Sequence, residues 1–535
     1  MSDNVEQRIA SLLVSGKLDE AFQAIEEAAS SVSLSEIKLL NLKGLLARAN
    51  SDVETAENLL LEAIRIDNDF VPALSNLTSL YVSLGRYRDA LAYAKRAFDR
   101  TNPKTLAVAM PLITILLDSA RVEEAVRVIE ALPQKKREHK DPQLALAACY
   151  RQKGIIAEAD SIITKLLSAH PDDPTILRVH ADLIGEVGRV DPLPYYERAL
   201  TAAQAAGKKN LSALLWNMSL HLLRARDFER GWQYYEEGLS NTVGTLGRPL
   251  PQQFKFAKRA MLEEINTSHW TFIIVEQGIG DQILFLSAMQ EAIDRLVKVA
   301  LICEERLKPI LKRSFPSLVL LSAGVIESIQ TTGIPNNGYI PLGSLFGFFR
   351  PSLDSFLKSR RPFLRVNKSK FVRFRDILKR KASGRAIIGL SWKGGFWENQ
   401  QRNKAVSLSS WEAVLKQPIL AVNLQYGNVE DDLRWSASCG YDISVFPNID
   451  FKQDLDGWLA ISAACDGVIS VSTALVHFAG ACNQKVAVVM PESKGPWILG
   501  LNDNRSIAYP NVHYFRRKEE ESLEQLLVRV SKIIA

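Results

Sequence analysis

The stretch GRYRDAL at residues 85–91 has close counterparts throughout the first third of the chain. The related segments are GKLDEAF (16–22), VETAENL (53–59), ARVEEAV (120–126) and GIIAEAD (154–160). Each contains one alanine of a regular series, Ala21, Ala56, Ala90, Ala125 and Ala159, whose successive members are 35, 34, 35 and 34 residues apart. A small residue recurring at this period predicts helical hairpins whose two helices lie in close contact.

This spacing is the period of the tetratricopeptide repeat, in which each unit is a helix–turn–helix. A degenerate unit begins at Gly188, and a final unit, LLWNMSLHLLRARDFERGWQYYEEGL, occupies residues 214–239. The sequence therefore predicts an all-α tetratricopeptide solenoid over residues 1–240. Such arrays usually bind protein segments on a curved surface, so we expect a protein partner, with dimerisation or a spacer role as the alternative.

Composition indicates an ordinary globular protein of several domains. The 535 residues are 47% hydrophobic and 24% charged, and the net charge of +6 gives no reason to expect a nucleic-acid partner. Five cysteines are scattered without metal-ligand spacing, so neither structural zinc nor a disulfide framework is expected. The sequence begins without a secretory signal and contains no apolar run long enough for a transmembrane segment. We therefore expect a cytoplasmic protein.

The pattern changes after residue 268 to short β-branched runs that alternate with helical segments. The predicted strands cover residues 270–275, 298–303, 386–392, 419–425, 466–472 and 485–491. Strands that alternate with helices predict parallel sheets covered on both faces, and ligands bind such sheets at the carboxyl ends of the strands.

The change of pattern also suggests domain boundaries. We expect a linker at 241–268, one lobe at 269–375 and a second lobe at 383–535. The basic stretch 360–381 is interpreted as the link between the lobes, with a phosphate- or membrane-binding role as the alternative. Two Rossmann-like lobes that face each other form the GT-B fold found in many nucleotide-sugar glycosyltransferases.

The segment VEQGIGDQILFLSAM (275–289) joins an apolar strand to an apolar helix. Gly278 and Gly280 allow a tight turn, but Ile283 stands where a dinucleotide fingerprint would have its third glycine. Asp281 then starts the helix. Its carboxylate is either a helix cap or a general base that removes a proton from an acceptor hydroxyl, and the spacing alone does not decide between them.

Two further segments carry polar residues at predicted strand ends. In SWKGG, Lys393 lies on a glycine-rich turn where it could neutralise a diphosphate, and Arg402 could add a second cation. The alternative for Lys393 and Arg402 is that both are surface residues. NLQYG offers Gln425 and Tyr426 as contacts for the base or ribose of a nucleotide.

The segment STALVH (472–477) follows another strand and opens a helix. Ser472 and Thr473 at the start of that helix are typical of an anion site. His477, one turn later, is a candidate for contact with sugar or phosphate, or a buried histidine with a structural role. In DLD (454–456), helix-capping acids are favoured over a metal-binding pair, so no metal site is predicted.

Taken together, DFERGWQYYE, EQGIGDQILF, GLSWKGG, NLQYG and SVSTALVHFAGA resemble bacterial tetratricopeptide-linked glycosyltransferases. The second half is similar to the lipopolysaccharide heptosyltransferase family. The resemblance implies a metal-independent, inverting GT-B enzyme that uses a nucleotide-sugar donor and needs no other cofactor. It also implies that Asp281 is the base, that Lys393 contacts phosphate and that 472–477 is the donor loop. Ser472 replaces the aspartate of that loop, which leaves the donor open.

Some members of the tetratricopeptide-linked group resemble flagellin glycosyltransferases. The sequence therefore predicts sugar transfer to Ser or Thr hydroxyls of a protein, with flagellin as one expected acceptor, and His477 assisting. The alternatives are a glycolipid or polysaccharide acceptor, and a scaffold without catalytic activity.

Overall fold

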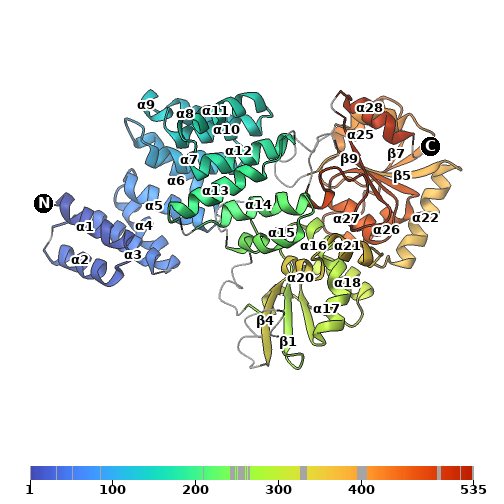
Figure 1. Cartoon of the computed structure of the whole chain (residues 1–535), viewed down its shortest axis with the longest axis horizontal. Coiled ribbons are helices and arrows are strands. Elements are labelled where there is room, and N and C mark those ends of the chain that lie inside the picture. The colour runs from blue at the N-terminus through green and yellow to red at the C-terminus, as the bar shows by residue number, and fades with distance from the viewer. Residues whose placement is uncertain are drawn as a thin grey trace. The chain divides into compact units, whose positions relative to one another are not determined.

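A computed structural model describes the chain apart from residues 1, 32, 51, 85, 189, 209, 241–246, 249, 251–258, 261, 263–264, 326–333, 395–406, 491–495, 519 and 533–535. The chain forms two compact units, one of them Met1–His180 and the other made of Ala181–Asn241 and Leu246–Ala535 (Figure 1). The boundary falls inside helix α12 (Pro174–Val187).

The first unit consists of paired antiparallel helices, which confirms the predicted helical repeats. All five repeat alanines are completely buried, because each lies where the two helices of a hairpin meet. The helices before α12 are α1 (Ser2–Val14), α2 (Leu18–Ser30), α3 (Glu36–Ala49), α4 (Val53–Ile66), α5 (Val71–Ser83), α6 (Tyr87–Arg100), α7 (Leu106–Asp118), α8 (Val122–Glu130), α9 (Gln134–Arg137), α10 (Lys140–Gln152) and α11 (Ile156–Ala169).

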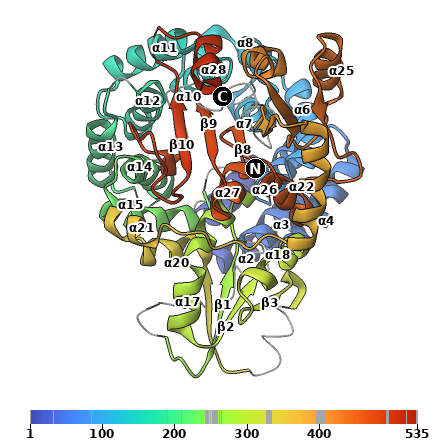
Figure 2. The ribbon, with the colours of Figure 1, turned by 90° about the vertical axis from the view of Figure 1, so that its right-hand side faces the viewer.

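The second unit begins with helices of the predicted last repeats and continues into two parallel sheets. Its first helices are α13 (Leu193–Ala205), α14 (Ser212–Arg224) and α15 (Phe228–Tyr235), followed by the 3-10 helix η1 (Glu236–Leu239). Figure 2 shows the two sheets one above the other, with α20 and α27 between them.

The smaller sheet has four parallel strands in the order β3-β2-β1-β4. Its strands are β1 (Trp270–Ile274), β2 (Val299–Ile302), β3 (Val319–Leu321) and β4 (Asn336–Pro341). The helices that accompany it are α16 (Ile279–Phe285), α17 (Met289–Leu296), α18 (Lys308–Ser314), α20 (Leu342–Phe349) and α21 (Leu353–Ser359).

The larger sheet has six parallel strands in the order β10-β9-β8-β5-β6-β7. Its strands are β5 (Ala386–Ser391), β6 (Ile419–Asn423), β7 (Ile443–Ser444), β8 (Gly467–Val471), β9 (Val486–Met490) and β10 (Val512–Arg516). Its helices are α22 (Lys368–Ala382), α24 (Glu412–Leu415), α25 (Glu430–Ser438), α26 (Leu455–Ala464), α27 (Ala474–Ala481) and α28 (Leu523–Ser531).

In both sheets the strand order reverses beside the first strand. The first strand, β1 or β5, lies between the second strand of its sheet and the fourth, β4 or β8. Open parallel sheets bind their ligands at this reversal, beyond the carboxyl ends of the strands. The topology therefore draws attention to the loops after β1, β4, β5 and β8.

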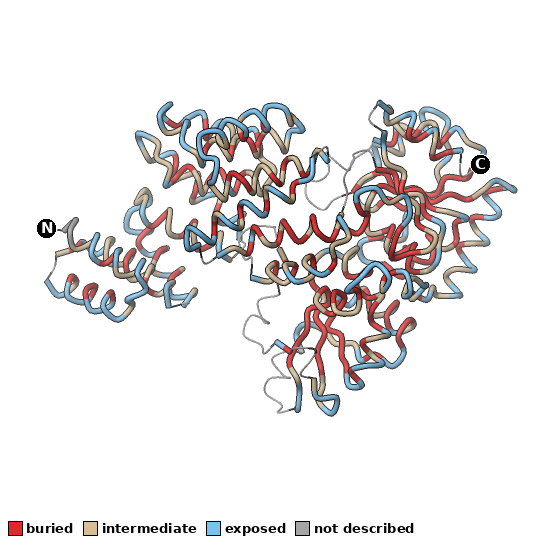
Figure 3. The backbone as a smooth tube through the Cα atoms, in the orientation of Figure 1, coloured by how far each residue is buried: buried red, intermediate tan, exposed pale blue. Residues whose placement is uncertain are grey.

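Burial follows the sheets, whose strands are mostly buried (Figure 3). One apolar core extends from α14 and α15 through the smaller sheet to α26 and α27. The six predicted strands are all present, with ends that differ by one or two residues. Among the strands in the described residues, β3, β4, β7 and β10 were not predicted.

Helix α22 contains most of the basic stretch that was interpreted as a link. Its cations contact the larger sheet and its helices: Arg375 pairs with Asp466 at 2.6 Å and Lys381 donates to Ser444 Oγ at 3.1 Å. Within the described part of the chain, no helix combines the length and the apolar character that crossing a membrane requires.

Candidate functional site at the ends of the two sheets

The loop after β1 lies at the reversal of the smaller sheet. Glu276, two residues beyond the strand, is buried, and its Oε1 accepts a bond from the Gly343 N–H after β4 at 3.0 Å. Gln277 has a φ of +66°, and its carbonyl accepts a bond from Gln282 Nε2 at 3.0 Å. The loop is thus fixed by contacts to β4's side of the sheet and to α16.

Asp281 lies near the start of helix α16. Gly278 is the N-cap of α16 and Asp281 lies in the first turn, so Asp281 is not the capping residue. A Cβ added to Gly278 would be 3.5 Å from Asp281 Oδ2, which places the carboxylate beside the Gly278 backbone. Asp281 is half-buried.

Helix α16 packs directly on α27, which follows β8 of the larger sheet. The two helices are close together at Gly280, where a Cβ would lie 3.1 Å from His477 Cδ2 and 3.4 Å from Ala474 Cα. Carbon atoms in ordinary contact are 3.5–4.0 Å apart, so a side chain at this position would require His477 to move by a few tenths of an ångström. The loop with Asp281 and the helix with His477 therefore meet, although each comes from a different sheet.

His477 is half-buried and held by a tyrosine. Its Nδ1 is 3.1 Å from the hydroxyl oxygen of Tyr509, and the opposite ring edge, with Cδ2, faces Gly280. Burial lowers the pKa of His477 to about 4, so the imidazole is neutral near pH 7. When the Tyr509 hydroxyl donates to Nδ1, Nε2 carries the proton and is a hydrogen-bond donor.

Two buried tyrosines lie within electrostatic reach of Asp281. Burial is the main reason that the pKa of Tyr235 and that of Tyr509 are raised, and the negative charge of Asp281 raises both further. Tyr235 comes from α15, whereas Tyr509 comes from the segment before β10. Both hydroxyls therefore keep their protons at neutral pH.

A buried ion pair between Arg248 and Glu276 stabilises the loop after β1. Arg248, which is 0% exposed, donates from Nη2 to Glu276 Oε1 at 2.9 Å and from Nη1 to Glu236 Oε1 at 3.0 Å. Its guanidinium also lies 4.5 Å from the centre of the Tyr235 ring. The second oxygen of Glu276, Oε2, is buried and has no hydrogen-bond partner among the described residues.

In the larger sheet, Gln425 organises the turn that carries Lys393. Its Oε1 accepts bonds from the Lys393 N–H at 2.8 Å and from Ser391 Oγ at 3.0 Å, and its Nε2 donates to the Tyr426 carbonyl at 3.0 Å. The amine of Lys393 forms an ion pair with Asp432 of α25. Asp432 therefore holds the cation beside the carboxyl ends of β5 and β6.

Helix α27 begins shortly after β8, the strand next to β5 in the larger sheet. Ser391 of β5 pairs with Ser470 of β8, so the turns that carry Lys393 and Ser472 leave adjacent strands, which lie about 4.8 Å apart. Thr473 is the N-cap of α27, but its hydroxyl lies 3.0 Å from Ser470 Oγ and does not cap the helix. Lys393, Ser472 and Thr473 are thus brought to one reversal point.

Two other predicted residues are placed less centrally. Tyr426 is half-buried, with its ring 6.2 Å from that of Trp458 in an edge-to-face contact. Arg402 lies outside the described residues. The contacts predicted for Tyr426 and Arg402 with a nucleotide sugar stay predictions.

The acidic DLD segment has structural partners. Asp454 accepts a bond from the Gly457 N–H at 2.7 Å, which confirms that it caps α26. Asp456 pairs with Arg313 of α18 and, at 3.1 Å, with Lys370 of α22. Among the described residues, no group of three or more His, Cys, Asp or Glu side chains is arranged to hold a metal ion.

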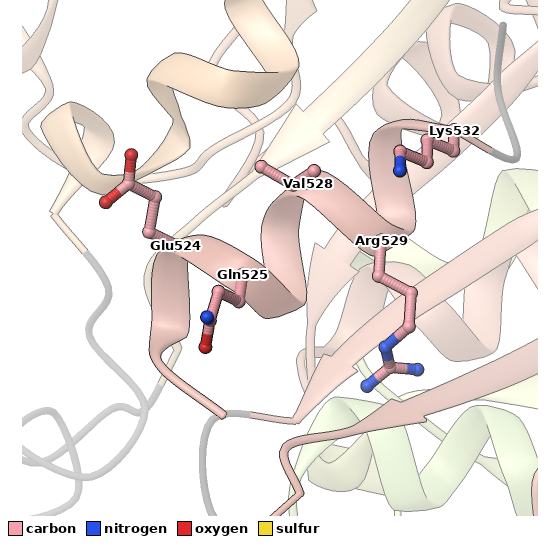
Figure 4. Close-up of a pocket in the computed structure, with 5 residues that line it drawn as sticks. All are labelled: Glu524, Gln525, Val528, Arg529 and Lys532. Carbon is pink, nitrogen blue, oxygen red and sulfur yellow. The ribbon is translucent and has the colours of Figure 1, made fainter. Parts of the chain in front are cut away.

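Four residues of this region were not predicted from the sequence: Tyr235, Arg248, Asp432 and Tyr509. Only Tyr235 carried a signal, since it belongs to the DFERGWQYYE segment. A surface hollow of about 370 Å³ lies elsewhere, on α28, and is lined by side chains from one helix and its end (Figure 4). The convergence of loops, and not this hollow, marks the candidate site.

Comparison with known proteins supports the repeat array. Residues 73–104, which contain Ala90, match the tetratricopeptide repeat family. The protein FlbA of Caulobacter vibrioides is 25% identical over 358 residues, which are 63% of this chain and 58% of FlbA. A match of that extent continues beyond the first 240 residues. The chain spans less than two thirds of the length of FlbA.

Two solved structures of tetratricopeptide proteins are similar to part of the chain. One, from Parabacteroides merdae, is 17% identical with a TM-score of 0.36 and covers 45% of this chain and 92% of that protein. Another, from Thermus thermophilus, is 17% identical with a TM-score of 0.28 and covers 34% of this chain and 99% of that protein. The family match and the regular period make the first part of this chain a tetratricopeptide array, a type of surface that usually binds proteins.

Proposed function

We propose that the second unit is a GT-B glycosyltransferase that moves a sugar from a nucleotide-activated donor to a protein hydroxyl. The observation that carries the proposal is the close contact between α16 and α27 at Gly280, because it brings the helix turn that contains Asp281 against the helix that contains His477. The reversal of strand order beside β1 and beside β5 supports it, since ligands of open parallel sheets bind there.

Asp281 is proposed to be the general base. Its carboxylate takes the proton of a Ser or Thr hydroxyl, and the oxygen attacks the anomeric carbon of the donor from the side opposite the diphosphate. The new glycosidic bond forms as the bond between carbon and phosphate oxygen breaks, and the configuration inverts. Asp281 is close enough to Tyr235 and Tyr509 for its negative charge to raise the pKa of each, so both hydroxyls stay protonated near the proposed base.

The leaving diphosphate is proposed to lie at the start of α27. The positive end of the helix dipole, Ser472, Thr473 and the Lys393 amine stabilise the negative charge that develops there. His477 is neutral at pH 7 and acts as a hydrogen-bond donor instead of as a cation. Gln425 contributes by holding the Lys393 turn.

The tetratricopeptide array is proposed to hold the polypeptide acceptor. Repeat arrays bind extended protein segments, and the array and the proposed transferase belong to one chain. Intact-mass analysis of proteins from the native host, with and without this gene, would identify the acceptor and the sugar together. A mass increment on flagellin that disappears with the gene would support the expected acceptor.

The proposal is tested by Asp281→Asn in a transfer assay with UDP-, GDP-, ADP- and CMP-sugars. Loss of a general base lowers kcat by about 10²–10⁴-fold, while binding of donor and acceptor is retained. Asp294→Asn is the matched control, since Asp294 is an exposed aspartate of α17 in the same lobe. Undiminished turnover by Asp281→Asn would contradict the assigned role.

One observation favours a second candidate, a protein-binding scaffold without transferase activity. The ion pair with Asp432 neutralises Lys393, which reduces the positive charge available to a diphosphate. A scaffold binds none of the nucleotide sugars. Calorimetry with the same four donors distinguishes the two functions, because measurable binding that Asp432→Asn strengthens supports the transferase.

A further inference from the structure

The last helical hairpin, α14 and α15, contacts elements of both sheets. Trp232 of α15 donates from Nε1 to the Arg350 carbonyl after α20 at 2.7 Å, and its ring meets that of Trp497 edge to face. Arg226, in the turn between the two helices, pairs with Asp503 and donates to the Ile498 carbonyl at 3.1 Å. The hairpin is thus packed within the body that carries the candidate site.

Tyr235, at the end of α15, extends this packing to the loop before α16. The residue is 0% exposed, and its ring lies 5.2 Å from Trp232 and 4.9 Å from Trp216. Its hydroxyl accepts a hydrogen bond from Gln277 Nε2. The aromatic packing fixes the ring, so the hydroxyl is a fixed acceptor for the loop.

Gln277 needs such a contact because of its backbone conformation. Its φ of +66° is uncommon for a residue with a side chain. The Gln277 side chain is bonded to Tyr235, and its carbonyl accepts a bond from Gln282 of α16. Asp281 lies four residues beyond Gln277 and one before Gln282, so the bonds that hold Gln277 also fix the turn that presents the carboxylate.

We infer that Tyr235 is a positioning residue of the candidate site, through which the last repeat hairpin sets the orientation of Asp281. The inference rests on the proposed function and extends the site to a helix that the sequence pattern assigned to the repeats. Tyr235 acts through its hydrogen bond with Gln277, and it touches no substrate in this role.

The test is Tyr235→Phe in the full-length chain, which keeps the ring and removes only the hydroxyl. We expect kcat to fall about 10-fold while KM for the donor changes less than about twofold, because the base is misplaced and the donor residues are not. Tyr234→Phe, the adjacent and half-buried tyrosine, is the matched control and should retain the activity of the unmodified chain.

Gln277→Ala removes the donor of the same hydrogen bond and provides an independent variant. If the bond is the cause, the double variant Tyr235→Phe/Gln277→Ala has about the same kcat as the more damaged single variant. If the loss of kcat in the double variant equals the product of the two single losses, the inference is overturned, because the two side chains then act separately. Unchanged kcat in both single variants would overturn it as well.

Hydrogen exchange separates this inference from the proposed function. In Tyr235→Phe, amides of residues 277–285 should exchange faster than in Tyr234→Phe, whether or not the chain transfers sugar. Faster exchange in a chain that lacks all turnover would sustain the positioning role and refute the transferase. Unchanged exchange in an active chain would refute the positioning role alone.

Discussion

Replacing Gly343 by alanine should destabilise the second unit through the buried ion pair beneath the candidate site. A Cβ at this position would lie 2.6 Å from Glu276 Oε1, 3.1 Å from Arg248 Nη2 and 3.2 Å from Phe285 Cε2. Carbon and oxygen atoms do not approach this closely without a bond. The carboxylate must therefore move, and it has little freedom because Glu276 is buried and bonded on one oxygen by three donors.

The size of the effect follows from the bonds that the displacement breaks. Moving Oε1 by about 0.6 Å stretches the 2.9 Å bond from Arg248 and the 3.0 Å bond from the Gly343 N–H to about 3.5 Å, where hydrogen bonds are lost. A hydrogen bond to a charged group contributes about 1.5–3 kcal/mol, so the loss of two costs about 3–6 kcal/mol. Alanine regains about 0.5–1 kcal/mol over glycine in a helix, so the net loss is roughly 2–5 kcal/mol.

Urea unfolding followed by tryptophan fluorescence measures this loss. Gly324→Ala is the control, because its Cβ would meet nothing within 4 Å, and its free energy of unfolding should change by no more than about 0.5 kcal/mol. If Gly343→Ala proves as stable as Gly324→Ala, the buried pair is not rigid, and the explanation of how the loop after β1 is held fails.

Two further predictions concern stability. Asp454→Ala should lower the free energy of unfolding by about 1 kcal/mol, because the cap of α26 is lost, whereas Asp454→Asn keeps a capping oxygen; equal losses in thermal unfolding would exclude capping as the cause. Burial lowers the pKa of His477 to about 4 from the ordinary 6.5, so the unfolded chain binds more protons between these values and stability falls as the pH drops from 6.5 towards 4. His477→Gln should make the free energy of unfolding less dependent on pH, by at most about 3 kcal/mol between pH 6.5 and 4. If the variant loses as much stability over this range as the unmodified chain, the neutral ring of His477 is not buried.

The sequence predicted the elements with a strong period and missed the weak ones. The repeat alanines and the strands of the two sheets with continuous apolar runs were recognised because period and composition agreed. NNGYIP, which forms β4, begins with three residues that disfavour strands, and β7 has only two residues. These two strands form because they pair with β1 and β6, and such pairing cannot be read from the local sequence.

The candidate site was predictable only where its residues lie in one segment. Asp281, Lys393 and Thr473 each follow an apolar strand, and that position is visible in the sequence. Tyr235 and Tyr509 are separated by 274 positions, and only folding brings both within electrostatic range of Asp281. The ion pair of Lys393 with Asp432 likewise depends on how α25 packs.

The outer strands of the larger sheet have a consequence for the behaviour of the protein at high concentration. Exposed backbone at a sheet margin can recruit strands from other molecules. Here β7 offers only Ile443 and Ser444 as a template. At the opposite margin, β10 is partly shielded by the bridge between Arg505 and His513. Short or shielded edge strands of this kind reduce the tendency of the chain to form intermolecular sheets and to aggregate.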